Sequence, residues 1–452
     1  MSVPAYSRYK ASNCDWLGDV PDHWNLRRLG YFFEERRQKV SDKDFPALSV
    51  TKNGVMPQLE TAAKTDDGDN RKRVALGDFV INSRSDRKGS SGVSPLDGSV
   101  SLINTVLKPL DGVEARFAHH LLRSTAFQEE YYRYGKGIVA DLWSTNYSEM
   151  RAITLALPSF SEQTAIAAFL DRETGKLDAL VEEQKRLIEL LKEKRQAIIS
   201  HAVTKGLDPD APMKDSGVKW LGEVPKHWEV APLKRFLGVV SGFAFPSSDF
   251  SHNSSDTPLL RGVNVAIGEL RWNEVVYWSR REGDGLDAFE LIEGDVVIGM
   301  DRPWIGEGLR IAHLTEPDLP CLLLQRVAAL RPQRQLLAQY LVQLLCGDAF
   351  YHHCVPEMTG VSVPHISPSQ IGDFVVALPP VHEQDVLVES LSKLKVGTDE
   401  LIGTTEAAIA LLQERRSVLI SAAVTGKIDV RSMDKVNDPA TPITKVREMV
   451  SE

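Results

Sequence analysis

Two stretches of the chain place apolar residues at alternating steps of three and four, the spacing that brings side chains to one stripe of a helix. The first stripe consists of Leu177, Leu180, Gln184, Leu187, Leu191, Lys194 and Ile198. The second lies 221 residues further along and consists of Thr398, Leu401, Thr405, Ala408, Leu412, Arg415 and Leu419. Each stripe predicts a long amphipathic helix with polar interruptions in its seam.

Two seams of equal length in one chain favour packing of the two helices against each other as a coiled coil. We predict that the pairing residues are Leu177, Leu180, Leu187, Leu191, Ile198, Leu401, Ala408, Leu412 and Leu419. The alternative is that each helix packs separately on its own domain. A continuous helix over residues 161–204 would be about 65 Å long at about 1.5 Å per residue, a length suited to a spacer.

The segments outside these helices alternate between short apolar runs and polar loops. ALGDFVIN at residues 75–82 resembles IEGDVVIG at residues 292–299, and each predicts a strand that begins at a Gly-Asp turn. In both places a polar loop, a second apolar strand and a helix follow, the helices at residues 115–134 and 333–350. These patterns predict globular domains of α/β or mixed α+β class.

Larger repeats show that the chain contains two copies of one plan. WLGDVPDHW at residues 16–24 matches WLGEVPKHW at residues 220–228 at seven of nine positions. LPSFSEQ from Leu157 corresponds to LPPVHEQ from Leu378, and both continue into the predicted helices. We therefore predict a first globular domain at 1–156, a first helix at 157–208, a second globular domain at 209–377, a second helix at 378–430 and a flexible tail at 431–452.

The order and duplication of these motifs resemble the specificity subunit of type I restriction-modification systems. The resemblance rests on the Trp-Leu-Gly-x-Val-Pro-x-His-Trp motif, the Gly-Asp strand and the Leu-Pro-x-x-x-Glu-Gln start of a long helix, each present twice. It implies two target-recognition domains and two helices that pair antiparallel, with pseudo-two-fold symmetry inside one chain. It also implies that each domain reads one half of a bipartite site in double-stranded DNA, in a complex with two modification and two restriction subunits.

The same resemblance implies that this chain is not itself an enzyme. The assembled complex would be an adenine-N6 DNA methyltransferase and an ATP-dependent endonuclease, whose partner subunits use S-adenosylmethionine, ATP and Mg. Pro379-Pro380 lacks the Asn/Asp and the aromatic residue of an adenine methyltransferase motif. Gly426-Lys427-Ile428 lacks the upstream glycine and the hydroxyl of a phosphate-binding loop. We therefore expect no catalytic residue and no cofactor on this chain.

One cluster has the residue types of a metal site, namely Cys346, His352, His353 and Cys354. Its spacing matches no common zinc pattern, and the first domain has no such residues at the corresponding positions. We therefore expect no bound metal.

Composition narrows the compartment and the mode of binding. The hydrophobic fraction of 42% and the charged fraction of 25% are typical of a soluble globular protein. We expect a cytoplasmic protein, since there is no apolar run of about 18 residues and no signal peptide. Four cysteines are too few for a disulfide framework. Because the net charge is −9, any cations that bind DNA must be concentrated locally.

Base recognition needs Arg, Lys, Asn, Gln or Ser on loops that can enter a groove. The candidate loops in each domain are the one after the Gly-Asp strand and the one before the long helix. In the first domain we predict DNA contacts by Asn82, Ser83, Arg84, Arg87, Lys88, Lys136 and Asn146. In the second domain we predict them for Arg302, Trp304, Arg310, Ser362 and His365. The alternative for each is an ordinary solvated loop residue.

The repeated tryptophan motif is interpreted as structural. Its members Trp16, Trp24, Trp220 and Trp228 are expected to anchor each domain to the helices, with His23 and His227 bonded to backbone groups. The sequence thus favours a DNA-binding specificity subunit. The alternative is a coiled-coil protein-interaction scaffold without DNA specificity, and the missing motifs disfavour a self-sufficient nuclease-methyltransferase.

Overall fold

The computed structural model describes residues 4–59, 68–137, 143–306, 308–358 and 363–431. The chain divides into two compact units, the first made of Met1–Lys185 with Glu406–Glu452 and the second of Arg186–Thr405. Each long helix thus contributes one part to each unit, whereas the sequence suggested separate helical segments. Among the described residues, no helix combines the length and the apolar character needed to cross a membrane.

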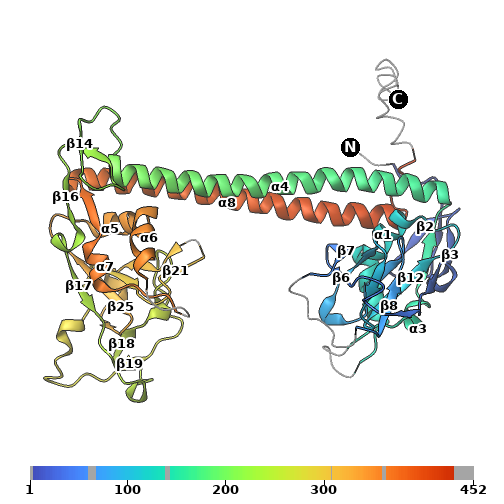
Figure 1. The fold of residues 1–452 in the computed structure, drawn as a ribbon, viewed down its shortest axis with the longest axis horizontal. Coiled ribbons are helices and arrows are strands. Elements are labelled where there is room, and N and C mark those ends of the chain that lie inside the picture. The colour runs from blue at the N-terminus through green and yellow to red at the C-terminus, as the bar shows by residue number, and fades with distance from the viewer. Residues whose placement is uncertain (1–3, 60–67, 138–142, 307, 359–362, 432–452) are drawn as a thin grey trace. The chain divides into compact units, whose positions relative to one another are not determined.

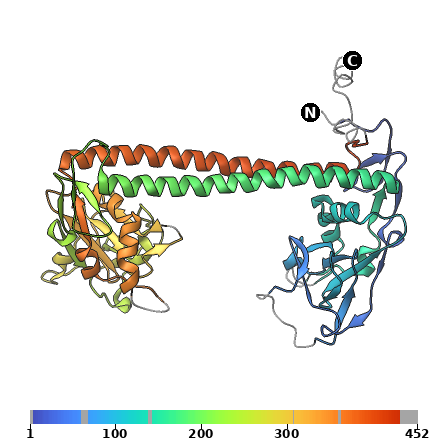
Figure 2. The same ribbon diagram turned by 45° about the horizontal axis from the view of Figure 1, so that its top comes forward.

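The two long helices are α4, Phe160–Lys205, and α8, Val381–Val424. Within each unit the two helices lie side by side and run antiparallel (Figures 1 and 2). In the first unit, Ile166 near the start of α4 shares a core with Val424 at the end of α8. In the second unit, Ala202 near the end of α4 shares a core with Leu387 near the start of α8. The predicted mixed α/β class with a long antiparallel helix pair is confirmed.

The seam of the pair differs from the predicted one. The prediction is wrong for Leu180, Leu187 and Leu401, whose exposed fractions are 43%, 42% and 56%. The residues that follow them, Val181, Ile188 and Ile402, are buried or half-buried instead. Leu180 and Leu187 are one heptad apart, as are Val181 and Ile188, so the period alone does not choose between two neighbouring stripes.

Several other predicted pairing residues are at least partly covered. Leu177 is buried, and those that are half-buried are Leu191, Ile198, Ala408, Leu412 and Leu419. Two arginines in the seam form ion pairs across it. Arg416 donates to Asp178 at 2.8 Å in the first unit, and Arg195 donates to Asp399 at 2.7 Å in the second.

The first unit is built around a four-stranded antiparallel sheet in the order β10-β9-β12-β4. Its strands are β1 (Tyr9–Ala11), β2 (Asp19–Pro21), β3 (Asn25–Arg28), β4 (Phe33–Glu35), β5 (Lys39–Val40), β6 (Leu48–Thr51), β7 (Gly54–Pro57), β8 (Arg71–Val74), β9 (Phe79–Asn82), β10 (Ser91–Val93), β11 (Gly98–Val100), β12 (Asn104–Pro109) and β13 (Thr154–Leu157). Its shorter helices are α1 (Ala115–Arg123), α2 (Thr125–Arg133), α3 (Tyr147–Met150) and the 3-10 turns Leu29–Tyr31 and Ser85–Arg87. Alternate residues of β9 enter different cores, since Phe79 packs with α1 and α2 while Val80 packs with Val55 and Val100.

The second unit repeats this sheet in the order β23-β20-β25-β17. Its strands are β14 (Met213–Asp215), β15 (Glu223–Pro225), β16 (Glu229–Pro232), β17 (Leu237–Ser241), β18 (Thr257–Leu260), β19 (Tyr277–Trp278), β20 (Val296–Gly299), β21 (Trp304–Ile305), β22 (Gly308–Leu309), β23 (Ile311–His313), β24 (Leu322–Leu323), β25 (Val327–Pro332) and β26 (Val375–Leu378). Its shorter helices are α5 (Ala338–Leu345), α6 (Asp348–Cys354), α7 (Pro368–Asp373) and the 3-10 turns Leu233–Arg235, Ser247–Asp249, Gly262–Asn264, Leu286–Phe289, Glu316–Asp318 and Val355–Glu357.

Several element boundaries differ from the predicted ones. Residues 157 and 378 end the strands β13 and β26 rather than begin helices. The single helix predicted at 115–134 is broken at Ser124, because the Ser124 side chain caps α2 by accepting from the Phe127 N–H. Nearly all of the predicted tail lies outside the described residues.

The Gly-Asp turn that precedes β9 and β20 is held in the same way in both units. Gly77 and Gly294 have φ of 87° and 89°, the left-handed region that favours glycine. The buried carboxylate of Asp295 accepts from the Ile292 N–H at 3.1 Å and from Arg331 Nε at 2.9 Å. Asp78 is bonded equivalently to the Ala75 N–H and to a guanidinium. This arrangement fixes where the central strand begins.

A second repeated feature joins each globular part to the start of a long helix. The carboxylate of Glu162, 5% exposed, accepts from Trp24 Nε1 at 3.1 Å and from Tyr6 Oη at 2.8 Å, and it is bonded to His23 Nε2 at 2.8 Å. In the second unit Glu383 is bonded to His227 and Trp228. The expectation that the two histidines bond backbone groups is therefore wrong, because each contacts a carboxylate.

We call the contact between the tryptophan motif and the start of a long helix the joint. The end of the other long helix packs on the same tryptophan in each unit. An added Cβ at Gly426, just beyond α8, would lie 2.3 Å from Pro21 Cδ and 3.3 Å from the Trp24 ring. Gly206, just beyond α4, is packed in the same way against the Trp228 ring. The first tryptophan of each motif packs on an aromatic ring of its own unit: Trp16 packs on Phe127, and Trp220 packs on Phe374.

Replacement of Glu162 by alanine should lower the free energy of unfolding by about 3 kcal/mol, because Trp24 Nε1 and Tyr6 Oη would be left without an acceptor. Glu383→Ala should be milder, since Glu383 is 25% exposed and, among the residues that the structure describes, its partners are His227 and Trp228 without a tyrosine. Denaturant titration followed by tryptophan fluorescence measures both, with the exposed Glu182→Ala as control. An equal or larger effect at Glu383 would contradict this account of the joint.

Candidate nucleic-acid interface

In the first unit the two loops predicted to bind DNA lie side by side. Arg84, in the loop after β9, forms an antiparallel bridge with Ser144, in the segment before α3. The Ser85 N–H donates to the Trp143 carbonyl at 3.0 Å, and the Thr145 N–H donates to the Ser83 carbonyl at 3.0 Å. Loops more than fifty residues apart in the sequence therefore form one surface.

The second unit makes the same junction with different side chains. Asp301 bridges His365, 221 residues after Ser144. The Arg302 N–H donates to the Pro364 carbonyl at 2.7 Å, and the Ile366 N–H donates to the Met300 carbonyl at 3.0 Å. The backbone framework is shared by the two units, and the residues mounted on it are not.

A third segment, which sequence reasoning missed, completes each surface. It is the turn before β12 in the first unit, where the Ile103 carbonyl accepts from Ser83 Oγ at 2.6 Å. In the second unit it is the turn before β25, where the Arg326 carbonyl accepts from the Met300 N–H at 2.9 Å. We call the three segments together the loop tip: residues 83–88, 102–103 and 143–145 in the first unit, and 300–302, 324–326 and 363–365 in the second.

The predicted DNA-binding residues of the first unit divide into two groups. Those that are exposed are Arg84, Arg87, Lys88, Lys136 and Asn146. Asn82 and Ser83 are buried; Asn82 accepts from the Arg84 N–H of its own loop and Ser83 donates to the Ile103 carbonyl of the next turn, so the structure gives them a positioning role. Lys88 is 2.6 Å from Glu129, and Lys136 is 3.3 Å from Glu149.

In the second unit, Arg302 and His365 lie at the loop tip, while Trp304 and Arg310 serve the fold. Trp304 is half-buried and packs against Phe350 and Tyr351. The Arg310 guanidinium is buried and donates to the carbonyls of Val265 and Asp301 at 3.0 and 2.9 Å. Its burial lowers its pKa. The structure thus gives the side chains of Trp304 and Arg310 a role in packing rather than the predicted role in DNA contact. The predicted Ser362 lies outside the described residues.

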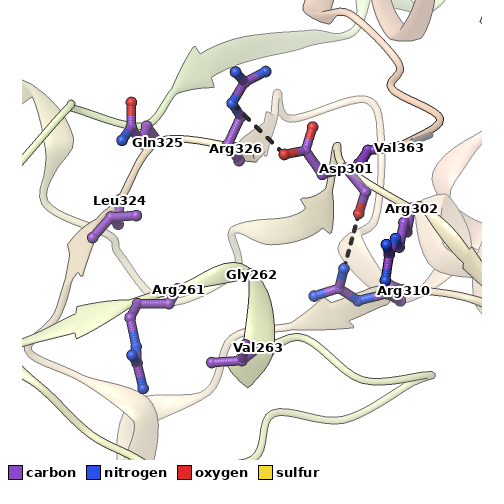
Figure 3. A pocket seen from close by; sticks show the side chains of 10 residues that line it. All are labelled: Arg261, Gly262, Val263, Asp301, Arg302, Arg310, Leu324, Gln325, Arg326 and Val363. Carbon is purple, nitrogen blue, oxygen red and sulfur yellow. Dashed lines mark hydrogen bonds and ion pairs between the residues drawn. The ribbon is translucent and has the colours of Figure 1, made fainter. Parts of the chain in front are cut away.

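A pocket of about 380 Å³ opens at the loop tip of the second unit. Its lining residues are Arg261, Gly262, Val263, Asp301, Arg302, Arg310, Leu324, Gln325, Arg326 and Val363. Figure 3 shows Arg326 facing Asp301 on one side of the pocket, with Arg261 and Val263 on the opposite side. Two of the lining residues, Arg302 and Arg326, are exposed arginines, so the pocket offers cationic donors to an electron-rich group.

The loop tip of the first unit has a different chemical character. Leu102, Ile103 and Trp143 are exposed there, at 42%, 38% and 38%, beside the exposed Arg84. Strand pairing shows the equivalence of the two tips: Asn104 lies opposite Asn82 as Val327 lies opposite Gly299. The first tip is therefore apolar where the second carries Gln325 and Arg326.

The cysteine and histidine cluster around α6 does not form a ligand set. Among the residues that the structure describes, no three His, Cys, Asp or Glu side chains are grouped as a metal site. His353 Nε2 is bonded to the Gln370 carbonyl at 2.9 Å, and burial raises the pKa of the Cys346 thiol to about 11. Both residues are accounted for by packing.

Fold and site together define a duplicated protein in which two mixed α/β units share a pair of antiparallel helices and each carries a loop tip of its own. No protein-family model matches the chain. It is 24% identical over 426 residues to the type I restriction enzyme MjaVIII specificity subunit of Methanocaldococcus jannaschii, covering 92% of this chain and 95% of that protein. It is 29% identical over 208 residues to the EcoAI specificity subunit of Escherichia coli, covering 46% of this chain and 35% of that protein.

Solved structures share the fold. A chain from a study of complex assembly and conformational transition in a type I R-M system matches with a TM-score of 0.68 at 17% identity, covering 90% of this chain and 99% of that one. The HsdS subunit from Thermoanaerobacter tengcongensis matches with a TM-score of 0.52 at 18% identity, covering 90% and 98%. The resemblance predicted from the motifs is confirmed, since the curated relatives of this chain are type I restriction enzyme specificity subunits.

Arg310→Ala should lower the free energy of unfolding by about 2 to 3 kcal/mol, because two buried carbonyls lose their donor and a cavity forms. Arg302→Ala, at an exposed neighbouring position, should change it by less than about 0.5 kcal/mol. Thermal or denaturant unfolding of the two variants makes the comparison. If Arg310→Ala were as stable as Arg302→Ala, Arg310 would be free to bind a ligand as first predicted.

Proposed function

We propose that this chain is the DNA-sequence specificity subunit of a type I restriction-modification enzyme, in which each unit reads one half of a bipartite target. One observation carries the proposal: the same three backbone segments form a loop tip in both units, with different side chains. A shared frame with unlike tips suits two readers of unlike sequences. A scaffold that binds only protein has no need of such a difference.

The chemistry of the tips supports DNA as the ligand. Each carries exposed cations that can approach phosphates, Arg84 and Arg87 in the first and Arg302 in the second. The net charge of −9 means that these local cations, and not bulk charge, would attract DNA. Leu102 and Ile103 would offer apolar contact to thymine methyl groups, whereas Gln325 and Arg326 would offer hydrogen bonds to purines.

The paired helices would bind the partner subunits. Leu180 and Leu401 are equivalent in the repeat, 221 residues apart, and are 43% and 56% exposed. Leu190 and Leu411 form a second equivalent pair, at 50% and 66%. A surface that an internal repeat presents twice suits two copies of one partner, in this proposal two modification subunits, which two restriction subunits would join. Those partners, and not this chain, would bind S-adenosylmethionine, ATP and Mg.

The chain alone should show neither methyl transfer nor DNA cleavage, and addition of its modification subunit should give sequence-specific adenine methylation that depends on S-adenosylmethionine. Arg84→Ala in that complex should weaken specific binding by about 1 to 3 kcal/mol if the residue contacts a base. Methylation mapping and binding titrations measure both effects. Turnover by the chain freed of partner protein would contradict the proposed division of labour.

Exchange of residues 36–150 for the matching segment of another specificity subunit should change one half of the methylated sequence and preserve the other. The reason is that this segment supplies the loop tip of the first unit only. Sequencing of methylated adenines in DNA treated with each complex reads out the result. A change in both halves would mean that the two tips do not read independently.

A further inference from the structure

Two residues of the second loop tip have a strained backbone. Among the described residues other than glycine, those with positive φ are Asn13, Arg302 and Arg326. Arg302 has φ of 45° and Arg326 has φ of 70°, and both line the same pocket. Glycine would adopt this conformation without penalty, whereas a side chain with a Cβ is disfavoured there. Such strain tends to persist where a side chain has a task at that position.

The surrounding backbone holds Arg326 in this conformation. The Arg326 carbonyl accepts from the Met300 N–H at 2.9 Å, and the preceding Gln325 N–H donates to the Phe243 carbonyl at 2.8 Å. Gly242 packs directly beneath the turn, since an added Cβ there would lie 2.0 Å from the Leu324 carbonyl oxygen. The turn is therefore fixed on both sides, and the direction in which Arg326 leaves the backbone is fixed with it.

The Arg326 side chain is oriented but still accessible. It is 61% exposed, and its Nε lies 3.6 Å from Asp301 Oδ2. The other oxygen of that carboxylate is bonded to His365 Nδ1 at 2.7 Å. By contrast, Arg310 and Arg261 of the same pocket each donate to backbone carbonyls. Figure 3 shows the Arg326 side chain extending past Asp301.

We propose that Arg326 reads a guanine in the half-site of the second unit, with Asp301 and His365 as its positioning residues. This inference rests on the proposed function, because it assumes that the loop tip enters a groove of DNA. The planar guanidinium matches the O6 and N7 acceptors of guanine in a bidentate manner.

The neighbouring carboxylate favours a base over a phosphate as the target of Arg326. The Asp301 carboxylate lies 3.6 Å from Arg326 Nε, so a phosphate bound to the same guanidinium would be held near a second anion and would be repelled by it. The edge of a base is neutral and meets no such repulsion. At the equivalent position the first unit has Ile103, which has no donor in its side chain, so this reading would be specific to the second half-site.

The test is selection from a library of randomised DNA duplexes by the full chain in complex with its modification subunit. With Arg326→Ala, the preference for guanine at one position of one half-site should fall about tenfold or more, while every other position is kept. Arg326→Lys should lose much of the same preference, because an ammonium lacks the planar pair of parallel N–H donors that fits guanine O6 and N7. Arg334→Ala is the matched control. Arg334 is exposed beyond the other end of β25, about 20 Å away at about 3.3 Å per residue. The Arg334→Ala complex should therefore select the same DNA sequence as the native complex.

Arg326→Gly separates reading from folding. Glycine accepts a φ of 70°, so this variant should melt at or above the temperature of the native protein and yet lose the guanine preference. A loss of thermal stability in Arg326→Gly would show that the side chain supports the fold, and would overturn the proposal.

Two results of the selection would also overturn the inference while leaving the proposed function intact. One is an unchanged selected sequence with Arg326→Ala. The other is a uniform loss of affinity for all sequences with a shallower salt dependence, which would mark a phosphate contact. Failure of the native complex to select any sequence would instead overturn the proposed function itself.

Discussion

The structure depends on a carboxylate at the start of each long helix that accepts hydrogen bonds from the tryptophan motif. Glu162 is 5% exposed, and a carboxylate so placed is tolerated only when its oxygens are bonded. Its partners, His23, Trp24 and Tyr6, come from the beginning of the chain. The next residue, Gln163, donates to the Gly112 and Pro158 carbonyls and accepts from the Glu114 N–H. The Glu-Gln pair therefore sets both the first turn of the helix and the loops around it.

The same joint explains why the two halves of the chain need each other. Trp24 packs between Glu162 at the start of α4 and Gly426 beyond the end of α8. Lys427 donates to the Asp19 carbonyl at 2.7 Å, as Lys205 donates to the Glu223 carbonyl at 3.2 Å in the second unit. Each unit thus contains the beginning of one long helix and the end of the other. The repeated tryptophan motif therefore makes the same contacts in both units, to the start of one long helix and to the end of the other. These two sets of contacts require the helices to run antiparallel.

Much of this frame could be predicted from the sequence, because its determinants are local and duplicated. The tryptophan motif, the Gly-Asp turn and the helix periodicity each occur twice in the sequence, and a comparison of the two copies predicts two similar domains and two long helices. The period does not decide the phase of the seam: the predicted Leu180, Leu187 and Leu401 are exposed, and the β-branched residue that follows each of them is more buried. At the tips, the sequence predicts two loops that the structure brings together, but it does not predict which of their side chains are exposed. Arg310 is bonded inward, whereas Arg326 reaches the tip only because β20 and β25 pair in one register.

Each loop tip contains buried residues that hold its segments together and exposed residues that do not. A rigid backbone can therefore carry a surface whose side chains differ between the units. Ser83 is buried and bonds a carbonyl of the neighbouring turn, so it holds the segments together. Arg84 is exposed and bonds no part of that turn through its side chain among the contacts described, so its replacement would leave the frame intact. Backbone hydrogen bonds between segments, such as that from Arg302 to Pro364, do not depend on side-chain identity. The tip is therefore assembled mostly by main-chain contacts, and its side chains are free to differ between the two units.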